Sequence, residues 1–167
     1  MKKSWVRLIL LLVLAGLGFW GWRVFFPGPE AVIRQRLTKL ARTVSFSGNE
    51  GNFAKVAHVQ ALPTFCTPDV EITVDVPGYS RQTISGHAEL IEAAGGARFS
   101  PTRINVEFFD ILVQVAPDQN SAVADLTARV NVSRDKDFYV QELKFQLKKV
   151  EGKWLIFRAE TVKTLSP

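Results

Sequence analysis

The stretch KKVEGKWLIFRAETVKTL, residues 148–165, contains the clearest structural pattern in the chain. Two long runs rich in β-forming residues meet at Glu151-Gly152, and a polar dipeptide with glycine is typical of a tight turn. The second run opens with Trp154, a large apolar side chain that can hold the start of a strand against a core. This stretch therefore predicts a hairpin of two long strands, over about 138–150 and 153–165.

Two further β-type runs, about 103–115 and 121–134, come before this hairpin, and short turn segments join each run to the next. All four runs are longer than the five or six residues of a typical strand. Every second residue from Ala122 to Val132 is apolar, as expected for a strand with one face in a core. The pattern predicts an antiparallel meander of four long strands.

The run INVEFFDILVQV, residues 104–115, changes phase in its middle. Its leading apolar residues fall at even positions up to Phe108 and at odd positions from Phe109 to Val115. A β-bulge, which is an extra residue in one strand, would produce this change and would bend the sheet. We therefore expect a bulge next to Phe108-Phe109 and a curved sheet.

Three helices are predicted ahead of the meander. Pro29 suits the first turn of the first helix, and Pro63 ends the second. Ser85 is a suitable N-cap for the third helix, and Gly95-Gly96 is expected to stop it. The expected bounds of the helices are 30–44, 52–62 and 86–94.

A single alternating strand at 70–76 and a short partner strand lie between the second and third helices, with a turn at Pro77-Gly78. Helices that precede a long, bent sheet form an α+β arrangement, in which the helices cover one face of the sheet. We predict this fold class: three helices packed on a long, curved antiparallel sheet.

Residues 1–26 have a basic start, followed by an uncharged apolar run at 8–22. This run is shorter than the roughly 20 residues that cross a bilayer core. The flanking Arg7 and Arg23 extend it, because long basic side chains reach back to the headgroups. The residues predicted to lie in the membrane or at its surface are Leu8, Leu12, Leu14, Trp20 and Trp22.

A cleaved signal peptide is the alternative for 1–26, because the basic and apolar regions fit either reading. Bulky residues occupy 19–26, FWGWRVFF, where small residues would precede a cleavage site. This favours an uncleaved anchor, 1–26, followed by a domain, 27–167. A short basic tail ahead of a single span usually stays in the cytoplasm. We therefore expect a single-pass protein of the cell inner membrane, with its domain on the periplasmic side.

The net charge of +5 does not indicate a nucleic-acid-binding protein. Residues 1–26 hold four basic residues and no acid, so the domain itself is nearly neutral and lacks a basic stripe for phosphate groups. The single cysteine, Cys66, excludes an internal disulfide and a thiolate metal cluster. The two histidines, His58 and His87, are not spaced as a ligand pair. We expect no metal, no cofactor and no nucleic acid.

Several short motifs resemble the nuclear transport factor two superfamily, in a membrane-anchored bacterial form. These motifs are Phe65 and Asp69-Val70 at the first strand, Gly86 at the third helix, and Gly152-Lys153-Trp154 at the last strand. The resemblance covers about 30–165. It implies the α+β cone of ketosteroid isomerase and polyketide-cyclase-like proteins, whose open end is a ligand pocket. The residues expected to line such a pocket here are Phe53, Val56, Phe108, Leu126, Phe145 and Trp154.

Enzymes of this superfamily place a carboxylate, a histidine or a tyrosine inside an apolar pocket. Asp110 and His87 are the candidates for the general base of a lyase or isomerase. No two polar residues form a recognisable acid–base pair, so we expect a non-catalytic domain that binds an envelope protein partner or a small apolar ligand. Cones of this fold commonly form homodimers through the outer face of the sheet, where Val123, Leu155 and Phe157 would lie.

Overall fold

The computed structural model describes residues 27–47, 50–75, 81–99, 103–132 and 138–162. The predicted membrane anchor, 1–26, lies outside the described residues. One six-stranded sheet contains all the strands, in the order β2-β1-β6-β5-β4-β3. The elements in chain order are α2 (Pro29–Val44), α3 (Asn52–Ala61), the 3-10 helix η1 (Leu62–Phe65), β1 (Cys66–Val74), β2 (Gln82–Ser85), α4 (Gly86–Phe99), β3 (Ile104–Val115), β4 (Ser121–Val132), β5 (Phe138–Val150) and β6 (Lys153–Thr161).

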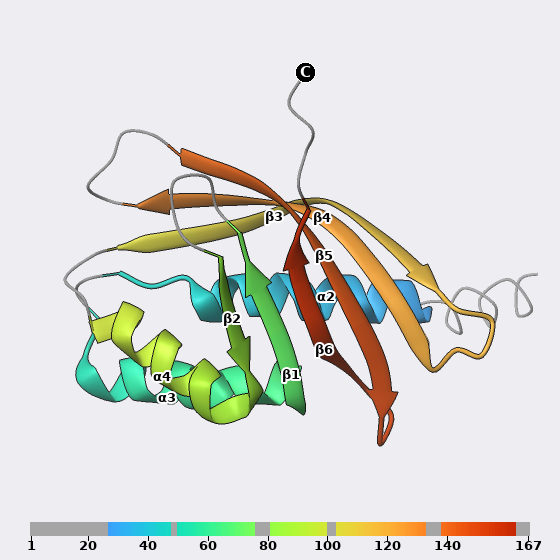
Figure 1. Cartoon of the computed structure of the whole chain (residues 1–167), viewed down its shortest axis with the longest axis horizontal. Coiled ribbons are helices and arrows are strands. Elements are labelled where there is room, and N and C mark those ends of the chain that lie inside the picture. The colour runs from blue at the N-terminus through green and yellow to red at the C-terminus, as the bar shows by residue number, and fades with distance from the viewer. Residues whose placement is uncertain (1–26, 48–49, 76–80, 100–102, 133–137, 163–167) are drawn as a thin grey trace, which may run out of the picture.

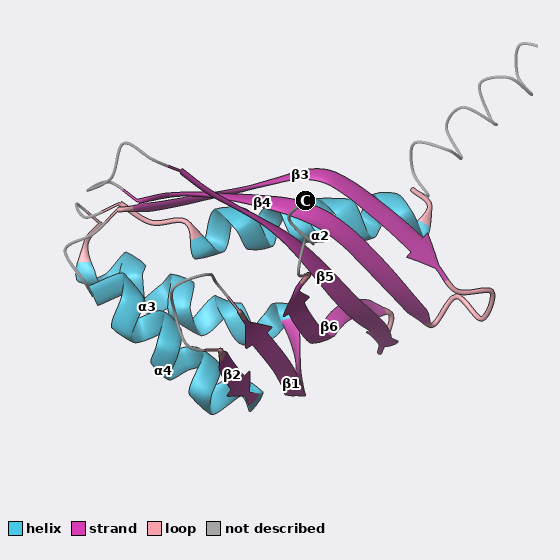
Figure 2. Cartoon of the chain, turned by 45° about the horizontal axis from the view of Figure 1, so that its top comes forward, coloured by secondary structure: helices cyan, strands magenta, loops and turns pink. Residues whose placement is uncertain are grey.

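The three helices lie on one side of the bent sheet, as predicted (Figure 1). Figure 2 shows α2 alongside β3 and β4, while α3 and α4 lie side by side near β1 and β2. The prediction of a wholly antiparallel sheet is wrong, because β1 pairs with β6 in parallel. Sequence periodicity indicates which residues form a strand, but it carries no information on a partner 87 to 90 residues away.

Apolar spacing explains how α2 packs on the sheet. Ile33, Leu37 and Ala41 recur at intervals of four residues and are the buried residues of the helix. Pro29 occupies its first turn, where the missing N–H donor has no partner within the helix in any case. This helix therefore begins and faces the core as the sequence predicts.

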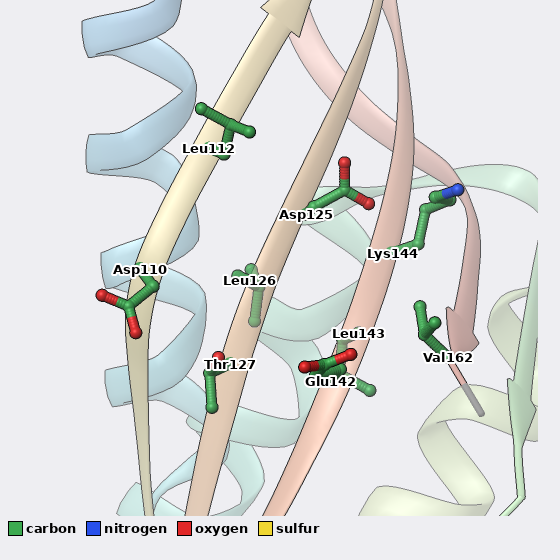
Figure 3. A pocket seen from close by; sticks show the side chains of 9 residues that line it. All are labelled: Asp110, Leu112, Asp125, Leu126, Thr127, Glu142, Leu143, Lys144 and Val162. Atoms are coloured by element: carbon green, nitrogen blue, oxygen red, sulfur yellow. The ribbon is translucent and has the colours of Figure 1, made fainter. Parts of the chain in front are cut away.

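The bulge in β3 lies at Asp110, directly after the predicted Phe108-Phe109 pair. The register shifts between Phe109 and Leu112, and the backbone of Asp110 has a φ of 50°. Aspartate tolerates this left-handed conformation better than most residues. Because one extra residue is inserted here, Asp110 lies on the outer side of the sheet, where it borders a hollow (Figure 3).

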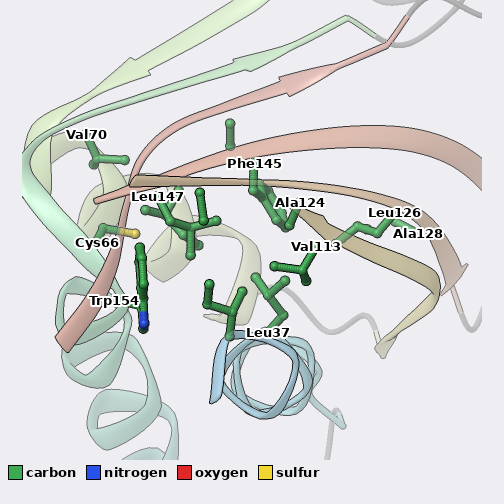
Figure 4. Packing of buried hydrophobic residues seen from close by; sticks show 14 residues of the cluster. Leu37, Cys66, Val70, Val113, Ala124, Leu126, Ala128, Phe145, Leu147 and Trp154 are labelled. Carbon is green, nitrogen blue, oxygen red and sulfur yellow. The ribbon is translucent and has the colours of Figure 1, made fainter. Parts of the chain in front are cut away.

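The β5–β6 hairpin forms as the sequence predicts. Glu151 and Gly152 both have positive φ angles, 49° and 78°, as the favoured two-residue hairpin turn requires. Trp154 follows the turn and is only 3% exposed. Figure 4 shows its indole in the core beside Cys66, with Leu37 of α2 on the same side of the sheet. The aromatic residue thus anchors the start of β6.

The helix α4 continues to Phe99, five residues beyond the predicted end, through Gly95-Gly96. Its last turn carries Arg98, which is 2% exposed. Nε and Nη2 of Arg98 donate hydrogen bonds to the carboxylate of Glu50, at 3.1 and 3.3 Å. Nη2 also lies 2.7 Å from Nδ1 of His58, which accepts because a guanidinium only donates. These tertiary contacts outweigh the poor helix propensity of the two glycines.

Arg98 also holds the segment that leaves α2. Its Nη1 and Nη2 donate to the carbonyl oxygens of Thr43 and Ser45, at 2.8 and 3.1 Å. The next residue, Phe46, forms an antiparallel bridge with Ile104, and the hydroxyl of Ser45 accepts a hydrogen bond from the N–H of Val106. The segment 45–46 therefore covers the free edge of β3 near its start.

Glu50 is ionised in this cluster. Burial raises its pKa, but the hydrogen bonds and the positive charge of Arg98 outweigh that effect and hold the pKa of Glu50 below its ordinary value. Arg98 and Glu50 thus form a partly buried ion pair that ties α4 to the end of α2.

Replacing Arg98 with methionine keeps the bulk of the side chain but leaves Glu50 and two carbonyl oxygens without their donor. We expect Arg98→Met to lower the free energy of unfolding by about 2 kcal/mol or more. Urea denaturation of the full chain in detergent, followed by near-ultraviolet circular dichroism, measures this loss. Arg81→Met, at an exposed position, is the matched control, and an equal loss in both variants would contradict the role given to Arg98.

Candidate functional site

A cavity of about 310 Å³ lies between the helices and the concave face of the sheet. The last turns of α2 form one wall, η1 and α4 contribute to another, and five strands supply the rest. Its lining residues are Leu40, Val44, Leu62, Cys66, Ile72, Thr73, Val74, Leu90, Phe108, Ala128, Val130, Gln141, Leu143, Phe145, Ile156, Ala159, Glu160 and Thr161.

The wall of this cavity on the sheet side is aromatic and aliphatic. The rings of Phe108 and Phe145 meet edge to face, with centroids 5.9 Å apart and an interplanar angle of 64°. The small side chains of Ala128 and Ala159 leave space beside these rings, and both alanines are buried. The geometry suits a rigid apolar molecule, because the wall offers surface contact and few hydrogen bonds.

Cys66 contributes a neutral thiol to this wall. Burial raises the pKa of the thiol to about 11, although the positive charge of Arg36 acts in the opposite direction. A thiol with this pKa is almost entirely protonated at neutral pH and is a poor nucleophile. Nε2 of His87 lies 3.3 Å from the carbonyl oxygen of Cys66, so this imidazole contacts the backbone behind the wall.

The polar residues of the cavity lining lie near strand ends, on the side of the cavity next to the C-terminal end of α2. Nε2 of Gln141 donates to the carbonyl oxygen of Val162 at 3.2 Å, which joins β5 to the end of β6. Glu160 lies opposite Lys144 in the register, and Lys144 borders the outer hollow. Because residues directly opposite each other share a face, the carboxylate of Glu160 is placed on the outer side of the sheet.

Two of the six predicted pocket residues, Phe108 and Phe145, line the cavity. Leu126 is buried in the core and borders the outer hollow. Trp154 is also buried in the core, away from the cavity lining. Phe53 and Val56 are 90% and 48% exposed, because α3 turns this face away from the sheet.

The prediction missed the helical part of the wall, which consists of Leu40 and Val44 of α2, Leu62 of η1 and Leu90 of α4. Leu40 and Val44 were recognisable as apolar positions of the first helix. The spacing alone does not separate them from Leu37, which packs directly on the sheet. The difference depends on how α2 packs against the bent sheet, with Leu37 in the core and with Leu40 and Val44 at the cavity.

A second concavity, of about 340 Å³, lies on the outer face of the sheet (Figure 3). Three carboxylates, Asp110, Asp125 and Glu142, border it together with Lys144 and the apolar Leu112. Asp110 is therefore separated from the apolar cavity by the thickness of the sheet. Among the described residues, no group of three or more acidic, histidine or cysteine side chains is placed to hold a metal ion.

Within the described ranges, which begin at residue 27, no helix has the length and apolar character needed to cross a bilayer.

Comparison with known proteins supports the fold and carries no activity with it. No family model and no curated protein matches the sequence. Among solved structures, an NTF2-like protein of unknown function from Pseudomonas putida has a TM-score of 0.64 and 12% identity, over 84% of this chain and 90% of that one. A cystatin-like protein of unknown function from Nostoc punctiforme has a TM-score of 0.60 and 12% identity, over 81% and 91%.

A candidate scytalone dehydratase from Novosphingobium aromaticivorans is also similar, with a TM-score of 0.57 and 13% identity, over 81% of this chain and 83% of that one. Identities this low show a shared fold alone, and a shared fold hosts many functions. The described chain therefore has the NTF2-like fold, also called cystatin-like, with three helices against a six-stranded mixed sheet.

Proposed function

We propose that this protein is a membrane-anchored, non-catalytic binding domain that takes a small apolar ligand into the cone. The apolar cavity behind Phe108 and Phe145 is the observation that carries the proposal. A dry cavity of roughly 150 Å³ holds a benzene molecule, so 310 Å³ corresponds to a ligand of about two fused or linked rings, or a short alkyl chain. Because the wall supplies few polar groups, the ligand body is uncharged.

The placement of the titratable groups favours binding over catalysis. A general base must lie within hydrogen-bond reach of the proton it takes, and Asp110 is on the other side of the sheet. His87 is the closer of the two candidates, since its ring reaches the backbone of Cys66. A lyase or isomerase mechanism, which is the alternative, would need this imidazole to turn into the cavity.

The membrane part of the proposal rests on the sequence of 1–26. Its apolar run, with Leu8, Leu12 and Leu14 inside and Trp20 and Trp22 at the surface, is long enough to span when basic side chains flank it. Only two residues, Pro27 and Gly28, separate this segment from α2. The domain would thus be held close to the outer surface of an inner membrane.

The outer face of the sheet is a second binding surface, and we propose that a second copy of the chain occupies it. Phe109 and Leu112 are exposed there by 38% and 54%, and Phe138 by 56%. Arg129 lies between the rings of Phe109 and Phe138, 4.9 and 5.0 Å from their centroids. A face that carries both signs of charge around apolar groups can pair with itself across a twofold axis.

Filling the cavity tests the ligand proposal. We expect Ala128→Leu to weaken binding of 1-naphthylamine, a neutral two-ring fluorophore, by at least about tenfold, because the added methyl groups occupy ligand space. Fluorescence titration of the full chain in detergent measures the affinity, and near-ultraviolet circular dichroism checks the fold. The matched control is Ala57→Leu on the exposed side of α3. Unchanged affinity in Ala128→Leu would exclude this cavity as the site.

The alkylation rate of Cys66 measures occupancy of the cavity independently of the fluorescence titration. A rise in the pKa of its thiol from 9.0 to about 11 reduces the thiolate fraction at pH 8 by about a hundredfold. We expect iodoacetamide to alkylate Cys66 in the folded chain at least about a hundredfold more slowly than in urea. Bound 1-naphthylamine should slow the reaction further. Mass spectrometry gives both rates, and a fast, ligand-independent reaction would place the thiol outside the wall.

The dimer proposal predicts a change of mass on substitution of the outer face. We expect Leu112→Asp to convert a dimer of the full chain into a monomer, since it brings a charge into an apolar contact. Phe53→Asp, at a more exposed apolar residue on α3, should leave the dimer intact. Sedimentation in detergent measures the masses. A monomeric unsubstituted chain, or a dimer insensitive to Leu112→Asp, would rule out this interface.

A further inference from the structure

The side of α2 that faces away from the sheet is basic. Ile33, Leu37 and Ala41 form the buried stripe of the helix, and Arg34, Lys39 and Arg42 are all exposed outside this stripe. The only acidic residue of α2 is Glu30, in its first turn. All three cations therefore lie beyond Glu30 along the outward face, which we call the basic face of α2.

The cations of this face have no acidic partner among the described residues. Across the described parts of the chain, no ion pair and no hydrogen bond engages the charged side-chain groups of Arg34, Lys39 or Arg42, although Thr38 and Thr43 donate to the backbone carbonyls of Arg34 and Lys39. Arg36, the remaining cation of α2, is used internally: it donates to the carbonyl oxygen of Thr64 and stacks over Phe65, 5.2 Å from the ring centroid. The basic face is thus available for an external anion.

A charged helix face is most often simply solvated. The basic face of α2 differs because of its position next to the proposed membrane span. The helix starts at Pro29, directly after the segment proposed to span the membrane. At a rise of about 1.5 Å per residue, Arg42 is roughly 20 Å from Pro29 along the helix axis. The short Pro27-Gly28 connection keeps all three cations within reach of the bilayer surface when α2 lies flat.

We propose that the basic face of α2 docks on the anionic lipid headgroups of the bilayer that holds the anchor. Each lysine or arginine near an anionic leaflet strengthens attachment by about fivefold, so three act together on the order of a hundredfold. The inference rests on the proposed function, because it needs the anchor to bring α2 to the surface. It also fixes the orientation of the domain: α2 lies between the bilayer and the cavity, which it lines with Leu40 and Val44.

The test uses the full chain in lipid nanodiscs, with Cys66→Ala and a fluorophore on a new cysteine at Thr38, an exposed residue among the three cations. Brominated lipid quenches a fluorophore that touches the bilayer. We expect strong quenching at Thr38 in discs with 30% phosphatidylglycerol, weaker quenching in neutral phosphatidylcholine, and relief by 0.5 M salt, which screens the charges. A fluorophore at Gln114, on the exposed outer face of β3, should remain unquenched in both.

Charge-reversal variants test whether the basic face itself, and not the net charge of the domain, causes the dependence on anionic lipid. Arg34→Glu/Lys39→Glu/Arg42→Glu should abolish the dependence of Thr38 quenching on anionic lipid. The control Arg81→Glu/Lys149→Glu/Lys153→Glu makes the same change of net charge at exposed residues of other elements and should leave it intact. Equal quenching at Thr38 in neutral and anionic discs, or equal loss in both variants, would overturn the docking proposal.

Retention of the chain in neutral discs distinguishes a missing anchor from a missing contact between α2 and anionic lipid. A chain that stays in phosphatidylcholine discs but shows no anionic effect at Thr38 keeps its anchor and loses the docking proposal. A chain that does not enter neutral discs has no anchor, and the docking proposal fails with it.

Discussion

The bend of the sheet is the constraint on which the rest of the structure depends. Extra residues at Asp110 in β3 and at Phe157 in β6 shift the strand register and curve the sheet around the helices. Four buried alanines on its concave face have small side chains that leave room above the sheet: Ala122, Ala124, Ala128 and Ala159. Where α2 packs closely, Ile33 and Leu37 fill the space. Beside Leu40 and Val44 the space between the helix and the sheet is not filled by side chains, and this space is the apolar cavity.

Much of this fold follows from local sequence patterns. The four long strands, the turn at Glu151-Gly152 and the bulge beside Phe109 depend on residues close in sequence, so alternation and turn chemistry predict them. The parallel pairing of β1 with β6 depends on contacts between distant residues, and no periodic pattern encodes it. The continuation of α4 through Gly95-Gly96 is similar, because Arg98 finds its partners about 40 to 55 residues earlier in the chain.

The cavity was harder to predict than the core, and for a physical reason. Apolar residues that line a cavity and apolar residues that fill a core have the same hydrophobicity, so Phe145 and Trp154 look equivalent in sequence. Only the curvature of the sheet places Phe145 at the cavity wall and Trp154 within the packing. Phe53 illustrates the converse case, since an apolar residue at helical spacing lies on the outside of α3. The positions of polar side chains also depend on the local shape of the sheet, because the bulge moves Asp110 to the outer face.

The segment that crosses the start of β3 affects how copies of this protein can meet. A free sheet edge invites edge-to-edge polymerisation, because its unpaired N–H and C=O groups accept any extended chain. Here one edge is β2, with only four residues, and the other is β3, where Ser45 and Phe46 occupy the backbone groups of Val106 and Ile104. The irregular backbone at Asp110 interrupts the remainder of that edge. At high local concentration, neighbouring copies would thus meet through side chains rather than extend one another's sheets into fibres.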